Sequence, residues 1–354
     1  EKYQLVAQKT RAVQVGVPSG CEIMDSIMPL TEPAKLLLLA TLLAKDRIIT
    51  HNGKAFMKEL ILRRDPRLID VLRDFDAQEG KDSTFLDSIN SMIEEESKKY
   101  FDGLYAECTL ERGKSLSKSE REAKNLNDQK SLIYGEVEFT SFARVLRKVN
   151  PPPGTKFYDL GSGTGRAVFA ARMLCDFDRC MGIEILSNLH DAAIKVVDRY
   201  NQYYRQYLST KRSQHVTVYQ GSVLTFDWAD GDVVFANSTC FDDNLMDGLS
   251  AKAELLKPGA FVITFTKGLT SDKFETMERK RYKMSWGPAT VFIHRRLNHD
   301  GSRFSLEELN VVSDDVSYQD DSDFADSDAQ DDELEDLTAD NPDLYDPNQF
   351  RYRS

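Results

Sequence analysis

The spacing of apolar residues divides this chain of 354 residues into a helical first part and a second part of mixed character. Before residue 107, apolar residues recur at intervals of three or four, as at Leu36, Leu39 and Leu43, and this spacing predicts helices. Between residues 157 and 294, short runs rich in β-branched and aromatic residues alternate with helical segments. Such alternation predicts a parallel sheet covered by helices on both faces.

Seven strands are expected in the second part of the chain. Five of them are expected to be parallel, at residues 157–160, 180–185, 216–219, 233–236 and 261–266. The last two, around residues 282–284 and 291–294, are joined by Gly287 and Pro288, which predicts a closing antiparallel hairpin. Helices are expected between the strands at residues 166–174, 188–208 and 243–256. The predicted fold class is therefore α/β, with a seven-stranded, mostly parallel, Rossmann-like sheet.

Changes in composition predict four regions along the chain. We expect a helical N-terminal region at residues 1–112, a polar and charged linker at 113–130, the α/β domain at 131–300 and an acidic tail at 312–354. The tail is expected to be disordered because a segment of Asp, Ser and Gln buries too little apolar surface to offset the entropy of ordering. The helical region either packs on the α/β domain or forms a separate partner-binding module.

The net charge of −12 arises from the tail. Residues 314–346 contain fifteen acidic residues and no Lys or Arg, which leaves 43 acidic against 46 basic residues elsewhere. The rest of the chain is therefore nearly neutral, and its charge neither excludes nor favours an anionic partner. The tail itself is expected either to keep the protein soluble or to bind a basic partner.

Cysteine, histidine and hydropathy patterns argue against a disulfide-bonded, a metal-binding and a membrane-spanning protein. The five cysteines are scattered without a C-x-x-C pair, so we expect reduced intracellular thiols. The five histidines have no ligand spacing, so no metal site is expected. The longest apolar run, residues 36–44, is too short to span a bilayer, which predicts a soluble protein. Because the first residue is Glu, the N-terminus and any targeting signal are expected to be missing.

A glycine loop at residues 159–165, Asp-Leu-Gly-Ser-Gly-Thr-Gly, lies between a predicted strand and a predicted helix. Glycines in this context permit a tight turn and a close approach by a ligand at the N-terminus of a helix. Glu184 closes the next strand, 25 residues after Asp159. A carboxylate at that position accepts hydrogen bonds from two ribose hydroxyls.

The details of the loop favour a methyl donor over a dinucleotide. Dinucleotide sites prefer G-x-G-x-x-G, whereas Arg166 and Ala167 follow Gly165 in this chain. Asp159 would repel a pyrophosphate but suits the ammonium group of a methionine moiety. We therefore expect S-adenosylmethionine as the methyl donor. A nicotinamide or flavin ligand, or a loop that only makes a turn, remains an alternative.

Three further motifs carry a resemblance to a known family. Tyr134-Gly135-Glu136 lies 25 residues before the loop, Asn237 to Phe241 follow the fourth strand, and Ser285-Trp286 lie near the hairpin. Over residues 133–294 the chain resembles the disruptor-of-telomeric-silencing (DOT-type) histone-lysine methyltransferases, which have a class I methyltransferase fold and no SET domain. The resemblance implies a nuclear enzyme that methylates lysine seventy-nine of histone H3 in nucleosomes.

The resemblance also implies a role for each matching residue. The lid over the methionine end of the cofactor would be formed by Tyr134, Gly135, Glu136 and Val137. The loop beneath it would comprise residues 157–166, among them Asp159, Leu160, Gly161, Ser162, Gly163, Thr164, Gly165 and Arg166. Glu184 would hold the ribose, Ser222 and Val223 would lie along the adenine edge, and Asn237 would lie beside the sulfonium. Phe241 and Trp286 would line the channel for the lysine.

The chain departs from the family at several positions. Ser222 stands where the family has an acid, Val223 where it has an aromatic residue, and Val291-Phe292 where it has two tyrosines. A basic stretch that family members use for nucleosome binding is absent from the C-terminal side. Contact with the adenine amine and one wall of the lysine channel are therefore expected to differ.

The chemistry of a lysine acceptor makes one demand on the channel. A lysine ammonium has no lone pair, so it must lose a proton before it can attack the donor methyl. A channel of Phe241, Trp286 and Phe292 would lower the pKa of the lysine by desolvation, and no dedicated base would then be necessary. Phe241 and Trp286 as core aromatics, Asn237 as a helix cap and Tyr134 as a packing residue remain alternatives.

Other functions on the same fold also remain open. A class I methyltransferase could act on a non-histone protein, RNA or a small molecule, and a non-catalytic scaffold could bind the donor without turnover. Residues 237–240 read Asn-Ser-Thr-Cys rather than the Asn-Pro-Pro-Tyr expected for exocyclic base amines, which counts against nucleic-acid bases. Intact Tyr134, Asp159, Glu184 and Asn237 count against a decayed enzyme.

Overall fold

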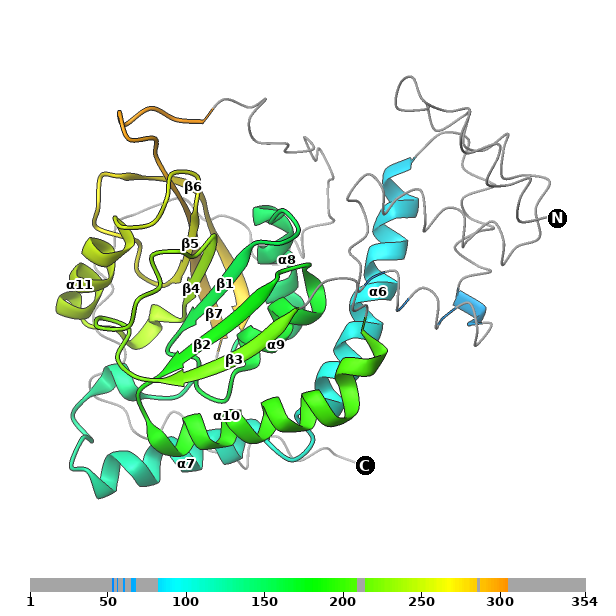
Figure 1. Cartoon of the computed structure of the whole chain (residues 1–354), viewed down its shortest axis with the longest axis horizontal. Coiled ribbons are helices and arrows are strands. Elements are labelled where there is room, and N and C mark those ends of the chain that lie inside the picture. The colour runs from blue at the N-terminus through cyan, green and yellow to red at the C-terminus, as the bar shows by residue number, and fades with distance from the viewer. Residues whose placement is uncertain are drawn as a thin grey trace. The chain divides into compact units, whose positions relative to one another are not determined.

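The computed structural model describes residues 82–208, 214–284 and 287–304, together with positions 53, 56, 60 and 65–67. The chain divides into two units at residue 312, and all described residues belong to the first. That unit contains a seven-stranded sheet with the order β3-β2-β1-β4-β5-β7-β6 (Figure 1). The helices predicted before residue 81 lie almost wholly outside the described residues, as does the acidic tail.

Five parallel strands and a closing antiparallel pair make up the sheet, which confirms the predicted fold class. The parallel strands are β1 (Lys156–Leu160), β2 (Arg179–Glu184), β3 (His215–Gln220), β4 (Val233–Ala236) and β5 (Phe261–Phe265). The antiparallel strands are β6 (Phe274–Met284) and β7 (Gly287–Arg296). The strand order reverses between β1 and β4, and ligands bind α/β sheets outside the carboxyl ends of strands at such a point.

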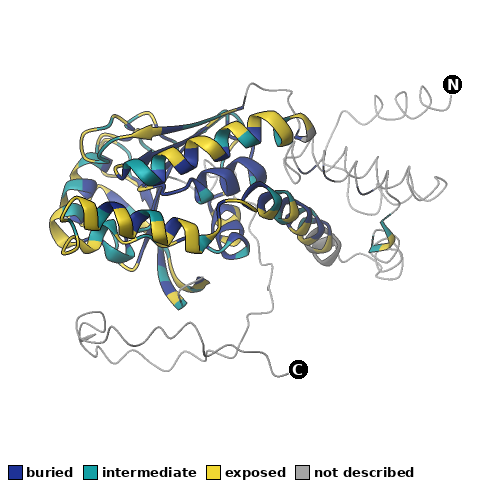
Figure 2. Ribbon diagram, turned by 90° about the horizontal axis from the view of Figure 1, so that it is seen from below, coloured by how far each residue is buried: buried dark blue, intermediate teal, exposed yellow. Residues whose placement is uncertain are grey.

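Helices cover both faces of the sheet. They are α6 (Asp82–Leu104), α7 (Leu110–Ala123), α8 (Phe139–Val149), α9 (Arg166–Leu174), α10 (Ser187–Arg199) and α11 (Asp243–Ala253). Figure 1 shows α11 on one side of the sheet and α8 and α9 on the other. Strand β1 supplies both layers, because successive side chains point to opposite faces: Phe157 joins the cluster under α8 and α9, and Tyr158 joins the cluster under α11. Figure 2 shows the exposed residues on the outward sides of these helices.

The stretch expected as a linker at residues 113–130 is mostly helical. It contains most of α7 and ends at Lys130, the first residue of the short 3₁₀ turn Lys130–Leu132. Thr109 caps α7, because its side chain accepts a hydrogen bond from the backbone N–H of Arg112 at 3.3 Å. The three buried residues of α7 are Gly113, Ser117 and Glu120. Because the buried face carries glycine and polar side chains, the apolar spacing that reveals other helices is missing here.

The hairpin exists as predicted, but its connection differs from the prediction. Gly287 and Pro288 do not form the turn; they begin β7 and pair with Met284 and Lys283. The connection falls at residues 285 and 286, outside the described part of the chain. The helix expected at residues 188–208 also changes character, because α10 ends at Arg199 and continues as a π turn (Tyr200–Tyr204) and a 3₁₀ turn (Arg205–Tyr207).

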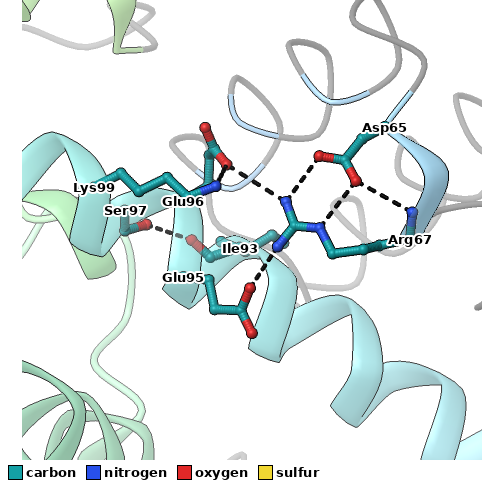
Figure 3. A network of polar contacts seen from close by, with 7 residues as sticks. All are labelled: Asp65, Arg67, Ile93, Glu95, Glu96, Ser97 and Lys99. Carbon is teal, nitrogen blue, oxygen red and sulfur yellow. Dashed lines mark hydrogen bonds and ion pairs between the residues drawn. The ribbon is translucent and has the colours of Figure 1, made fainter. Parts of the chain in front are cut away.

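An ionic network attaches the described residues 65–67 to α6 (Figure 3). The guanidinium of Arg67 contacts Asp65 at 2.8 Å, Glu95, and the nearly inaccessible Glu96 at 3.8 Å. Lys99 also approaches Glu96, at 3.1 Å. Helix α6 packs in turn against α9, the helix that follows the glycine loop. Within the described residues, no helix is both long enough and apolar enough to cross a membrane.

Candidate functional site

The glycine loop connects β1 to α9 through three residues in the left-handed region. Gly161, Gly163 and Gly165 have φ values of 82°, 54° and 87°, which side chains rarely tolerate. The backbone N–H groups of Gly161 and Ser162 both donate to the carbonyl of Ile183 in β2, at 2.9 and 3.0 Å. The loop is therefore held against the end of β2, next to the carboxylate that closes that strand.

Two buried carboxylates, Asp159 and Glu184, lie beneath the loop and are only 3% and 5% exposed. Glu184 accepts hydrogen bonds from the backbone N–H of Gly163 at 2.7 Å and of Leu186 at 2.8 Å. Within the described residues, Asp159 accepts no hydrogen bond at its side chain, and burial and the charge of Glu184 raise its pKa well above the ordinary value. Burial also raises the pKa of Glu184. Two such carboxylates favour a cationic ligand.

Residues 134–137 close over the loop. The hydroxyl of Tyr134 donates to Glu136 and lies 2.8 Å from the hydroxyl of Thr164. Glu136 forms an ion pair with Arg166 at 2.5 Å, and the guanidinium of Arg166 lies 4.4 Å from the ring centroid of Tyr105. Burial raises the pKa of Glu136 in spite of Arg166, and burial with the neighbouring Glu136 raises the pKa of Tyr134. Tyr134 therefore remains a protonated donor at neutral pH.

A chain of hydrogen bonds orients Asn237 at the end of β4. Thr266 donates to the hydroxyl of Thr239 at 3.3 Å, and Thr239 donates to the side-chain oxygen of Asn237 at 3.0 Å. The amide nitrogen of Asn237 then donates to the carbonyl of Gly135 at 3.2 Å. Thr266 itself has a φ of 65°, a costly conformation for a β-branched residue. Asn237 does not cap α11, since Asp242 does so by accepting from the N–H of Leu245.

The residues predicted for the acceptor channel are only partly brought together. Phe241 is buried against the cluster under α11, and its ring reaches to 3.8 Å from where a Cβ on Gly161 would stand. Phe292 instead stacks on His294, with ring centroids 5.8 Å apart, and Arg279 covers it. Trp286 lies outside the described residues.

Ser222 and Val223 form a turn after β3. The backbone carbonyl of Ser222 accepts from the N–H groups of Thr225 and Phe226, and the fully buried Trp228 donates to the carbonyl of Val223 at 2.8 Å. Both residues are half-buried, at the carboxyl end of the sheet beside β2. Their backbone is therefore fixed by neighbours, while the Val223 side chain packs against the cluster under α11 and the Ser222 hydroxyl accepts from the N–H of Leu224 at 3.3 Å.

The lid and the loop enclose a cavity of about 20 Å³. Nine of the residues predicted from the sequence line it: Tyr134, Gly135, Glu136, Val137, Asp159, Gly161, Ser162, Arg166 and Asn237. This volume corresponds to about one water molecule. Within the described residues no cluster of three or more His, Cys, Asp or Glu could hold a metal ion.

Several residues of the site were not predicted from the sequence. They are Tyr105, Gly113, Glu120, Thr239 and Thr266, which position predicted residues rather than line the cavity. Tyr105, for example, donates to the backbone carbonyl of Thr164 at 3.1 Å. Thr239 lies within the motif at residues 237–241, but the others lie far along the chain from the residues they contact, and no local motif indicates them.

Comparisons with known proteins place this arrangement in context. The model of the family described as histone methylation protein DOT1 matches residues 114–286. A Debaryomyces hansenii protein named histone-lysine N-methyltransferase, H3 lysine-79 specific, is 27% identical over 169 residues, which cover 43% of this chain and 14% of the relative. A Candida albicans protein of the same name is 28% identical over 135 residues, covering 37% and 10%. The chain thus matches only about a tenth to a seventh of these curated relatives' length.

Solved structures also resemble the chain, at low overall similarity. An RNA methyltransferase from Salinibacter ruber, in complex with S-adenosyl-L-homocysteine, covers 46% of this chain and 94% of its own, with 20% identity and a TM-score of 0.35. TrmN from Thermus thermophilus covers 45% of this chain and 52% of its own, with 16% identity and a TM-score of 0.36.

Proposed function

Because residues 114–286 match the model of the family described as histone methylation protein DOT1, we propose that this chain transfers a methyl group from S-adenosylmethionine to a lysine of histone H3. The two relatives named as specific for lysine 79 of H3 support that lysine as the acceptor. We propose nucleosomes in the nucleus as its setting. The observation that carries the proposal is the pair of buried carboxylates beneath a glycine loop, covered by the lid residues Tyr134 and Glu136.

The chemistry of these residues fits the donor. Asp159 offers an unpartnered buried carboxylate to the donor's positive charge, and each oxygen of Glu184 keeps a lone pair for a ribose hydroxyl. The turn at Ser222 and Val223 would support the adenine edge. The lid would open to admit the donor and then cover its methionine end. When bound, the donor supplies an electrophilic methyl group on a sulfonium.

Alignment is the main contribution that we assign to the protein. Methyl transfer from a sulfonium is an in-line displacement, which requires the nucleophile, the methyl carbon and the sulfur to be held in one line. Asn237, oriented by Thr239 and Gly135, would face the sulfonium side. Phe241 beside Gly161 would form one wall of the lysine channel and favour the neutral amine by desolvation. We assign the opposite wall to Trp286.

Label transfer to alternative acceptors tests the proposed function. Radiolabelled donor is incubated with intact nucleosomes, free histones and total RNA in parallel. We expect label on histone H3, and loss of that label when lysine 79 of H3 is replaced by arginine. Label confined to RNA would contradict the proposal, and unchanged label on the substituted H3 would contradict the choice of lysine 79. Label on free histones but not on nucleosomes would overturn nucleosomes as the substrate.

The affinity for S-adenosylhomocysteine, a stable analogue of the donor, is expected to weaken as the pH falls from 7 to 5. Burial raises the pKa of Asp159 and Glu184 in the free protein, and a bound ammonium and ribose favour their charged forms. Binding at low pH must therefore release protons. Titration calorimetry in buffers of different ionisation enthalpy measures both effects. A constant Kd without proton release over this range would contradict the assignment.

A further inference from the structure

The buried face of α7 is made of residues that do not usually hold a helix in place. Gly113, Ser117 and Glu120 are its three buried residues, at positions i, i+4 and i+7, and therefore lie on one side of the helix. One has no side chain and two are polar. Leu116, on the same side, packs against the core but is only partly buried, and each of the three buried residues meets a different part of the candidate site.

Gly113 forms one wall of a narrow slot for the ring of Tyr134. A Cβ on Gly113 would lie 2.3 Å from Cε1 of that ring, and a Cβ on Gly163 would lie 2.2 Å from Cε2. The ring is thus clamped between α7 and the glycine loop by two positions without side chains. Its hydroxyl is held at the same time by Glu136 and Thr164, so the ring cannot shift without breaking these bonds.

Ser117 and Glu120 hold the backbone on both sides of the site. The hydroxyl of Ser117 donates to the carbonyl of Leu132 at 3.0 Å, two residues before Tyr134. The carboxylate of Glu120 accepts from the backbone N–H groups of Ser187 at 2.9 Å and Asn188 at 2.6 Å. It thereby caps α10, which has no capping side chain of its own at Leu186.

The turn between β2 and α10 links Glu120 to Glu184, because both carboxylates accept hydrogen bonds from its backbone. The backbone N–H of Leu186 donates to Glu184 at 2.8 Å, and the next two N–H groups donate to Glu120. The turn that follows β2 is therefore fixed from both sides by carboxylates. Lys124 forms an ion pair with Glu120 at 2.5 Å, which keeps the capping carboxylate charged and in place.

We propose that the Gly113–Ser117–Glu120 face of α7 positions both halves of the donor site, the lid through Tyr134 and the ribose-binding turn through Glu184. These three are positioning residues, because they act through Tyr134, Leu132 and the start of α10 rather than by lining the cavity. The inference rests on the proposed function only for the identity of the ligand. Donor affinity is then a property of α7 as much as of the glycine loop.

Gly113→Ala tests the lid half of the inference. The added methyl would displace the Tyr134 ring, so we expect the Kd for S-adenosylhomocysteine to rise about tenfold or more, which corresponds to 1.4 kcal/mol. The matched control is Gly103→Ala in α6, where the new Cβ meets only the hydroxyl end of the Tyr204 side chain, at 2.8 Å. Both changes favour helix equally. Gly113→Ala binding as tightly as the wild type would overturn the lid contact.

Glu120→Ala tests the turn half of the inference. Loss of the cap leaves two N–H groups of α10 without an acceptor, and we expect the Kd for S-adenosylhomocysteine to rise about tenfold. Glu120→Gln keeps one acceptor oxygen and should fall between the wild type and Glu120→Ala. Glu122→Ala is the matched control, because Glu122 is exposed on the same helix. Its carboxylate forms only a long ion pair with Lys118, at 3.9 Å. Equal affinities for Glu120→Ala and Glu122→Ala would overturn the role of the cap.

Two further readouts separate positioning from simple loss of structure. The variants should raise the KM for the donor while the KM for nucleosomes stays unchanged, with an unaltered far-ultraviolet spectrum. Equal rises in both KM values would indicate a general structural defect and overturn positioning. A wild-type protein that binds S-adenosylhomocysteine but does not label histones would refute the proposed acceptor and leave this test intact. A wild-type protein that does not bind it would overturn both proposals.

Discussion

Replacing Glu184 by alanine is expected to raise the Kd for S-adenosylhomocysteine about 100-fold or more. Hydrogen bonds to a charged group contribute about 1.5–3 kcal/mol each, and the loss of two to the ribose corresponds to about two to four powers of ten in Kd. The substitution also leaves the N–H groups of Gly163 and Leu186 without their acceptor, which loosens the glycine loop. Titration calorimetry gives the Kd, and the melting temperature shows whether the variant is folded.

Glu254→Ala provides the control for a lost carboxylate. Glu254 accepts from Ser271 and Lys273 and lies just after α11, away from the cavity residues. We expect its removal to leave the Kd unchanged. A folded Glu184→Ala protein with wild-type affinity would refute the assignment of Glu184 to the ribose.

Replacing Asp159 by asparagine is expected to change stability and binding in opposite directions. The folded-state pKa of Asp159 is raised, so the stability that this group contributes is present at low pH and is lost as the pH rises. Asparagine avoids the cost of ionising a buried group, and at pH 8 we expect a gain of about 1 kcal/mol, or about 2–4 °C in Tm. The same change removes the proposed partner of the donor's ammonium group and should weaken S-adenosylhomocysteine binding about tenfold or more.

The pH dependence distinguishes this effect from ordinary repacking. The gain in Tm should be small near pH 4 and grow with pH, because only the wild type must ionise a buried carboxylate. Asp230→Asn is the control, since Asp230 is exposed and hydrogen bonds from Lys156 and Tyr158 lower its pKa despite the opposing effect of partial desolvation. Its stabilising effect is present above the unfolded-state pKa, so this variant should lose stability as the pH rises. A Tm gain for Asp159→Asn that is independent of pH would argue against a buried charge.

The central strands could be predicted closely from the sequence, and the edge of the sheet could not. The predicted strand at residues 233–236 agrees with β4, because a parallel strand buried on both faces is an uninterrupted apolar run. Strand β6 begins at Phe274, eight residues before the predicted start. It is an edge strand with exposed Arg279, Lys280 and Arg281, and charged edges hide the alternation on which the prediction relied.

The candidate site was predictable wherever a ligand-facing residue also terminates a strand or makes a tight turn. Glu184 ends β2, Asp159 is the last residue but one of the neighbouring β1, and the three glycines between β1 and α9 mark the turn. The orientation of Asn237 was not predictable, since it depends on Thr266, whose left-handed backbone has no sequence signature in a threonine. The sequence did not predict the proposed positioning role of α7, because its buried residues are a glycine and two polar residues, a composition that is typical of a linker.

The clamp around Tyr134 also bears on where a functional unit of this chain begins. Strand–helix alternation suggests a boundary near residue 131, yet one wall of the slot for the Tyr134 ring belongs to Gly113, and Glu120 caps a helix 67 residues further along the chain. The donor site is thus discontinuous in sequence. The start of the α/β domain that hydrophobic periodicity predicts therefore differs from the start of the proposed ligand-binding unit, and the proposed unit includes α7.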